Sequence, residues 1–290
     1  MPKFERILFP VDFSERSRAV APFVLSVAQR HQSRVALLHA LQPPPPMYTS
    51  LNTVYPEVYD FSGLSGDLRA EMEKFATAEL PKLDVTCAVE FGDPASVITA
   101  FTETENVSLI MMATHGHGAF RRALLGSVTA KVLHDAKVPV WTAAHAPEPA
   151  HRAHPKPRYI LCALDLKPES RHTLEVAIQI ASDNGASIEL FHVVPEGEIE
   201  SIRAETRIHD LLVEAARSRL VKIQEEADAT DIQTVLAGGS VADMLRDVAI
   251  RKRADLVVIG RGCIQKGFNG RLRANAYAIL REAPCPVLSV

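Results

Sequence analysis

The chain has 290 residues, of which 47% are hydrophobic and 23% charged. This composition is typical of folded globular protein, argues against disorder, and is long enough for two domains of ordinary size. The formal net charge of −3 gives no electrostatic reason to expect nucleic acid or an anionic membrane as a partner. The apolar runs are shorter than a membrane span, and the N-terminus lacks a signal-peptide layout, so we expect a cytoplasmic protein.

The first half of the chain alternates short apolar runs with segments of helical periodicity. Ser14 fits the N-cap of the first helix, Pro94 suits the first turn of a later one, and Ser127 begins the last. Pro22 lies inside the first helical pattern, so we expect a kink or a late start there. The apolar runs are each too short and apolar for a surface strand, and they predict strands over 6–11, 35–40, 85–90, 110–113 and 138–143.

A Pro-rich stretch over 42–66 interrupts this alternation after the second strand. We expect a long loop here, with Tyr48, Tyr55, Tyr59 and Phe61 as aromatic anchors. The loop is either a lid over a binding crevice or a flexible excursion, and the sequence favours neither.

The second half of the chain repeats the first. ERILFPVDFS at 5–14 recurs as RYILCALDLK at 158–167, and VSLIMMATHG at 107–116 recurs as ADLVVIGRGC at 254–263. The repeat and the alternation predict two tandem α/β domains, each a doubly wound, Rossmann-like parallel sheet with helices on both faces. We place the first domain at 1–145, a Pro-rich linker at 146–157 and the second domain at 158–290.

A glycine-rich loop follows the fourth predicted strand of the first copy. In a doubly wound sheet, ligands bind beyond the carboxyl ends of the strands where the strand order reverses. If that reversal separates the first and fourth strands, Asp12 faces this loop, in which Gly116 and Gly126 flank nine residues. Both glycines let a phosphate approach the main chain, and the next helix offers its first amides and the Ser127 hydroxyl. The loop lacks a Walker A ending and the third glycine of the dinucleotide fingerprint.

These residues also have structural explanations. Asp12 can cap the first helix, and the two glycines can serve a turn. His115 and His117 resemble a pair of metal ligands. Because no Cys, Asp or Glu supports them, they are better explained as loop residues. Arg121 and Arg122 either neutralise phosphate charge or form a solvated helix face.

Other reactive residue types give no site. His39 ends an apolar strand and is better explained as a hydrogen-bonded core histidine than as a base. The cysteines lack paired metal-ligand spacing, which favours buried or solitary thiols in a reducing compartment. They are Cys87, Cys162, Cys263 and Cys285.

Taken in order, ILFPVDFS, LLHA, GDPA, THG and GSVTAKVLHDAKVPVW resemble the universal stress protein family in its tandem form, over nearly all of both halves. In the nucleotide-binding branch of that family, Ala113 would be glycine, a small change unless its φ must be positive. The resemblance implies ATP, with Mg²⁺ as an optional companion. Asp12 would lie near the ribose or adenine, Ala40 and Met112 against the base, and the loop and following helix at the phosphates. The implied nucleotide-binding set is Pro10, Val11, Asp12, Ser14, Ala40, Met112, Ala113, His115, Gly116, Gly126, Ser127 and Val128.

The second copy departs from this motif. Aligned on the closing strands, Gly116, Gly126 and Ser127 are replaced by Cys263, Arg273 and Ala274. A long side chain at 273 and a lost hydroxyl at 274 remove the phosphate half of the site, although the second copy's basic loop residues can instead hold another anion. We therefore expect one nucleotide site per chain, with the second domain mainly structural or regulatory.

The family resemblance extends to assembly and function. Single-domain members pair as dimers, so we expect the closing strands PVWTA and PVLSV to join the two copies as an intrachain pseudo-dimer, with a further homodimer left open. The favoured function is an ATP-binding regulatory protein of the stress response. The alternatives are a slow ATP-hydrolysing or phosphotransfer enzyme, for which no nucleophile with its orienting partner stands out, and a nucleotide-free interaction module. We predict no catalytic residue and no metal ligand.

Overall fold

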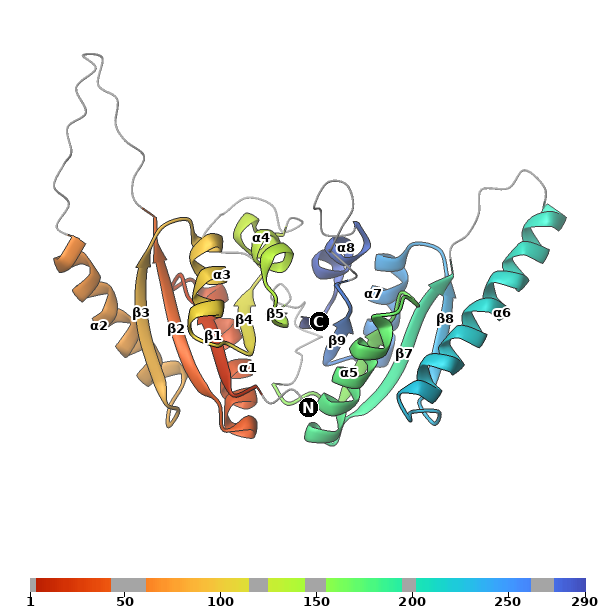
Figure 1. The fold of residues 1–290 in the computed structure, drawn as a ribbon, viewed down its shortest axis with the longest axis horizontal. Helices are drawn as coiled ribbons and strands as arrows, with labels where there is room; N and C mark the ends of the chain where they lie inside the picture. The colour runs from red at the N-terminus through yellow and green to blue at the C-terminus, as the bar shows by residue number, and fades with distance from the viewer. Residues whose placement is uncertain (1–3, 43–60, 115–124, 144–154, 195–201, 262–273) are drawn as a thin grey trace, which may run out of the picture.

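A computed structural model describes residues 4–42, 61–114, 125–143, 155–194, 202–261 and 274–290. The two domains share a ten-stranded sheet in the order β3-β2-β1-β4-β5-β10-β9-β6-β7-β8 (Figure 1). Every pairing is parallel except the one between β5 and β10. The strands are β1 Arg6–Pro10, β2 Arg34–Leu41, β3 Val85–Phe91, β4 Leu109–Ala113, β5 Val140–Ala143, β6 Tyr159–Ala163, β7 Ser187–Val194, β8 Thr234–Gly238, β9 Leu256–Ile259 and β10 Val287–Ser289.

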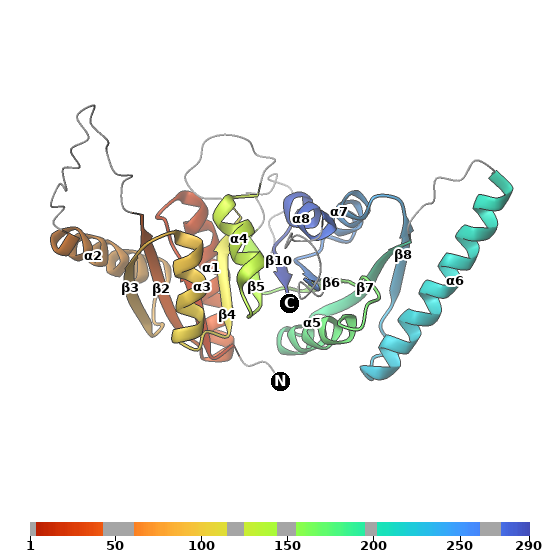
Figure 2. The same ribbon diagram turned by 45° about the horizontal axis from the view of Figure 1, so that its top comes forward.

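Helices cover both faces of the sheet. One apolar cluster packs α1, α2, α5 and α6 on one face, and a second packs α3, α4, α7 and α8 on the other. In both views α2 and α6 lie at the outer ends of the molecule, while α4 and α8 lie near its centre (Figure 2). The helices are α1 Glu15–His31, α2 Phe61–Glu79, α3 Pro94–Thr104, α4 Ser127–Asp135, α5 Ser170–Asn184, α6 Ile202–Glu226, α7 Val241–Lys252 and α8 Ala274–Glu282. Within the described segments, each helix is too short or too polar to span a bilayer.

The structure confirms the predicted α/β class, and β1 pairs with both β2 and β4, so the strand order reverses where the sequence placed the binding crevice. Strand β3 is an exception to the predicted burial, because it forms an edge of the sheet and exposes Thr86, Glu90 and Phe91. Strand β3 is apolar because one of its faces is covered by the core.

One local prediction needs correction, and one of two alternatives is excluded. The loop expected over 42–66 is helical from Phe61 onward, because the later turns of α2 bury Met72 and Phe75 against the sheet and outweigh the helix-breaking tendency of the glycines. Residues 43–60, with the three tyrosines, lie outside the described part of the chain. Pro22 does not delay α1, which begins at Glu15, capped by Ser14, and carries the proline on its exposed side.

The closing strands join the two domains, as expected for a pseudo-dimer. Strand β10 pairs antiparallel with β5, which places Leu288 opposite Trp141. Trp141 is 2% exposed and belongs to an apolar cluster with residues of both domains. Antiparallel pairing of equivalent strands is the arrangement that a two-fold relation between the copies requires. The sheet and its two cores therefore run without interruption through the junction.

The C-terminal ends of α1 and α5 also meet at this junction. His31 Nε2 of α1 lies 3.9 Å from Asp183 Oδ2 of α5, and the Arg30 guanidinium donates to the main-chain carbonyl of Asp183. The His31 ring also packs edge-on against Phe4, with centroids 5.2 Å apart. Burial lowers the pKa of His31 below its usual value, although the Asp183 carboxylate opposes the shift.

We expect acid to weaken the fold through His31. The unfolded chain binds a proton near the usual pKa of 6.5, whereas folded His31 takes it up only at lower pH, so unfolding becomes easier as the pH falls below 6.5. Urea titrations at pH 7.5, 6.5 and 5.5 should show a smaller acid-dependent loss of stability in His31→Gln than in the wild type. The exposed His172→Gln is the control and should follow the wild type. Parallel pH curves for wild type and His31→Gln would refute the assignment.

Candidate nucleotide-binding site of the first domain

The turn after β1 is held by Asp12. Its Oδ1 accepts hydrogen bonds from the Ser14 amide at 3.1 Å, the Ser14 hydroxyl at 2.6 Å and the Ser17 hydroxyl at 2.5 Å. Phe13 between them has a φ of 60°, and the Ser14 hydroxyl accepts from the Ser17 amide as the N-cap of α1. Ser14, and not Asp12, therefore caps α1. Asp12 instead ties the turn after β1 to Ser14 and Ser17, and these bonds fix its half-buried carboxylate at the switch point.

His39 has the structural role that its sequence context favours. Its Nδ1 lies 2.8 Å from the main-chain oxygen of Val11, and its ring packs against Phe13 with centroids 5.1 Å apart. The second domain repeats the contact between His192 and the oxygen of Leu164, also at 2.8 Å. These histidines tie the end of the second strand of each domain to the turn after the first.

The N-terminus of α4 is seated on the end of β4. The Gly126 amide donates to the oxygen of Thr114 at 2.9 Å, and the Thr129 hydroxyl donates to the oxygen of Ala113 at 3.0 Å. The amides of Ser127 and Val128 lie in the first turn, where no helical carbonyl can accept from them. Ser127 is exposed and Gly126 half-buried. These first-turn groups meet the requirements of an anion site at the carboxyl edge of the sheet.

The backbone at the two small residues of the motif is unstrained. Gly126, the N-cap of α4, has φ −61° and ψ 144°, a conformation open to any residue. Glycine is therefore not required there by dihedral angle, and the lack of a side chain leaves the main chain approachable. Ala113 ends β4 and is absent from the described positive-φ residues, so alanine fits in place of the family's glycine.

Apolar side chains line one side of this edge. Met112 of β4 is 5% exposed and belongs to the apolar cluster under α3 and α4. Pro10 and Ala40, at the ends of β1 and β2, are half-buried, whereas Val11 is buried on the face of α1 and α2. Because side chains alternate along a strand, Pro10, Ala40 and Met112 lie on the same face of the sheet. His115, Gly116, His117, Arg121 and Arg122 lie outside the described residues.

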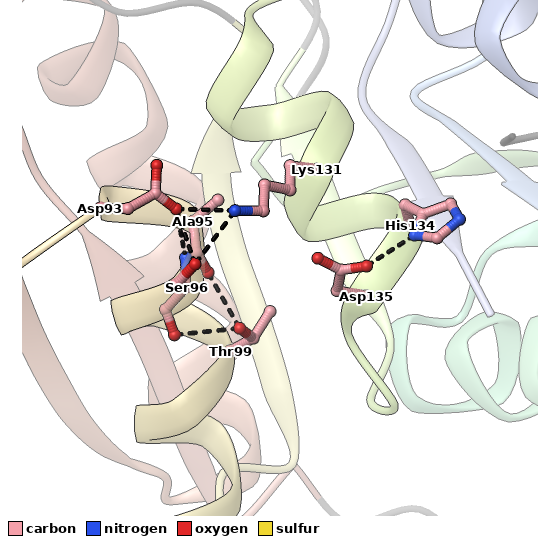
Figure 3. Close-up of polar contacts among 7 residues, drawn as sticks. All are labelled: Asp93, Ala95, Ser96, Thr99, Lys131, His134 and Asp135. Carbon is pink, nitrogen blue, oxygen red and sulfur yellow. Dashed lines mark hydrogen bonds and ion pairs between the residues drawn. The ribbon is translucent and has the colours of Figure 1, made fainter. Parts of the chain in front are cut away.

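A polar cluster beside the site was not predicted. Asp93, the N-cap of α3, accepts from Lys131 of α4 at 2.8 Å and from the Ser96 hydroxyl at 2.7 Å (Figure 3). The Lys131 hydrogen bond, with help from Ser96, lowers the pKa of Asp93 to about 2. On the opposite side of α4, His134 contacts Asp135 at 2.6 Å and points toward the second domain (Figure 3).

The second domain keeps a cavity at its own switch point, between β6 and β9. The cavity measures about 290 Å³ and is lined by residues that include Ala163, Asp165, Lys167, Phe191, Ile259 and Arg261. Asp165 repeats the turn of Asp12 by accepting from the Ser170 hydroxyl at 3.1 Å and the Lys167 amide at 3.2 Å. Lys167 takes the place of Ser14, and its ammonium lies 3.3 Å from Asp165. Cys263 and Arg273 lie outside the described residues.

Arg261 connects this cavity to the first domain. Its guanidinium donates to the main-chain oxygens of Ala136, at the end of α4, and Val138, the latter at 2.9 Å. Burial lowers the pKa of Arg261 to about 10. The helix whose N-terminus forms the candidate anion site is thus held at its C-terminus by the second domain.

The profile of the Universal stress protein family matches the chain twice, over residues 3–143 and 157–290. The chain belongs to the universal stress protein family. A universal stress protein of Mycolicibacterium smegmatis is 26% identical over 98% of this chain and 96% of its own length. Universal stress protein A homolog 1 of Coxiella burnetii is 27% identical over 46% of this chain and 95% of its own length, so it matches a single domain. A solved universal stress protein from Archaeoglobus fulgidus, 22% identical, aligns with a TM-score of 0.66 over 98% of this chain and 95% of its own, which shows the shared tandem fold.

Proposed function

We propose that this universal stress protein binds ATP at the carboxyl edge of its first domain and acts as a cytoplasmic regulatory protein. One observation carries the proposal: the first turn of α4 is seated on the end of β4, across the switch point from the Asp12 turn. The first-turn amides and the Ser127 hydroxyl would hold phosphates, with Gly116 contributing from the loop. Asp12 and Ser14 would lie near the ribose, and Pro10, Ala40 and Met112 against the base.

Regulation follows from how nucleotide binding would act on the chain. A bound nucleotide would stabilise the conformation of α4 and of the Asp12 turn that contacts it, and it would thereby change the surface offered to a partner. Mg²⁺, when bound with ATP, would supply charge neutralisation for the phosphates. Two further residues belong to the proposed nucleotide-binding set: His115, from the loop, and Val128, through its main chain.

Calorimetric titration of nucleotide-free protein with ATP tests this function. We expect one site per chain, and we expect heat-denatured protein purified without exchange to release ATP. Steady production of ADP would favour the slow ATP-hydrolysing enzyme instead. A protein that neither carries nor binds nucleotide would be an interaction module, and the proposal would then be wrong.

A further inference from the structure

Helices α3 and α4 lie side by side on one face of the first domain (Figure 3). One ion pair links the start of α3 to α4, and a second links the last turn of α3 to the residues that follow α4. At the N-terminal ends, Lys131 Nζ lies 2.8 Å from Asp93 Oδ2. At the other end, Lys137 Nζ, two residues beyond the end of α4, lies 2.8 Å from Glu103 Oε1 in the last turn of α3. All four side chains are substantially exposed, so neither pair contributes much to overall stability.

The pair at the N-terminal ends is part of a local network. Asp93 Oδ2 accepts from the Ser96 amide at 3.0 Å and the Ser96 hydroxyl at 2.7 Å, in addition to Lys131. Lys131 also donates to the Ser96 hydroxyl at 3.0 Å. One carboxylate oxygen therefore caps α3 and, at the same time, anchors α4 through Lys131, one helical turn after Ser127.

At the corresponding positions, the second domain carries residue types that cannot form either ion pair. The positions of Asp93 and Lys131 are occupied by Ser240 and Ala278 in the repeat. The residues at the positions of Glu103 and Lys137 are also uncharged, so neither ion pair can form in the second domain. The copy that lacks the glycine and serine of the phosphate motif is therefore also the copy without the link between the helix N-termini.

We propose that Asp93 and Lys131 are positioning residues for the phosphate chain, an inference that rests on the proposed ATP site. Their contact fixes the first turn of α4 against α3, which aims the amides of Ser127 and Val128 at the phosphates. Lys131 also neutralises Asp93, whose negative charge would otherwise lie beside the polyphosphate. Both effects act on phosphates and leave the base and ribose contacts unchanged.

The test compares ATP with adenosine, which lacks phosphates. Lys131→Ala should weaken ATP binding about tenfold and leave adenosine binding unchanged, because helix alignment and charge act on the phosphates alone. Lys131→Arg, which keeps the charge and the reach to Asp93, should restore most of the affinity. Calorimetry for ATP and ligand-observed NMR for adenosine provide the two dissociation constants.

Lys137→Ala is the matched control, because it breaks an equally short exposed ion pair between α3 and the residues just after α4, at the end remote from the site. It should leave both ligands unaffected. A wild type that fails to bind ATP overturns the proposed function itself. A wild type that binds ATP overturns this inference if Lys131→Ala binds it normally, weakens ATP and adenosine equally, or behaves like Lys137→Ala.

Discussion

Replacing Gly126 with arginine is expected to abolish ATP binding, lowering the affinity by ~100-fold or more. The N-cap dihedral angles of Gly126 suit any residue, so α4 still forms and the effect falls on the site. The new side chain occupies the space through which a phosphate reaches the first-turn amides, and each charge-assisted hydrogen bond lost there costs about 1.5–3 kcal/mol. Calorimetric titration with ATP measures the loss.

A second variant at this position separates two possible effects of Gly126→Arg: blocking of the phosphate and disturbance of the N-cap of α4. Gly126→Ser places a favoured N-cap residue with a small side chain at the same position, so α4 is retained and ATP binding should weaken far less. Arg273→Gly should not create a second site, because Cys263 and Ala274 still replace the glycine and the serine of the first copy. Undiminished ATP binding by Gly126→Arg, or two equivalent sites in the wild type, would contradict the proposed geometry.

The fold was predictable because its signals are local and occur twice. Short apolar runs between helical segments predict a parallel sheet, and the repeat shows that two such domains follow each other. The start of α2 was missed because it belongs to a Pro-rich stretch that indicates a loop, whereas the helix is stabilised by the burial of Met72 and Phe75 in later turns. The exposure of β3 depends on its edge position, which follows from strand order and cannot be read from its own residues.

The candidate site was predictable to a smaller extent. Asp12, Gly126 and Ser127 come from short motifs, but the structural role of Asp12 depends on hydrogen bonds that spacing alone does not reveal. The contact between Asp93 and Lys131 joins residues 38 positions apart on different helices, outside any local pattern. The contact of Arg261 with the carbonyl of Val138 spans 123 positions and two domains. Tertiary packing creates such contacts after the elements have formed.

The domain junction should be a main source of stability, and Trp141→Ala tests this. Trp141 is fully enclosed in β5, between Met111 of β4 and Leu288 of β10, and its cluster includes residues of both domains. Truncation leaves a cavity in this shared core, so we expect the free energy of unfolding to fall by about 3–5 kcal/mol. Urea unfolding followed by circular dichroism measures the change, because Trp141 is the sequence's only tryptophan and its fluorescence is lost in the variant.

Trp141→Phe distinguishes packing from hydrogen bonding at the same position. Among the described residues, Trp141 Nε1 has no hydrogen-bond partner, so removing the indole N–H relieves a desolvation cost and offsets part of the lost apolar contact. We therefore expect Trp141→Phe to lose less than about 1.5 kcal/mol. Phe91→Ala, an exposed aromatic on the edge strand β3, should change stability by no more than about 0.5 kcal/mol. If Trp141→Ala were as mild as Phe91→Ala, the pairing of β5 with β10 would not be where the two domains share their core.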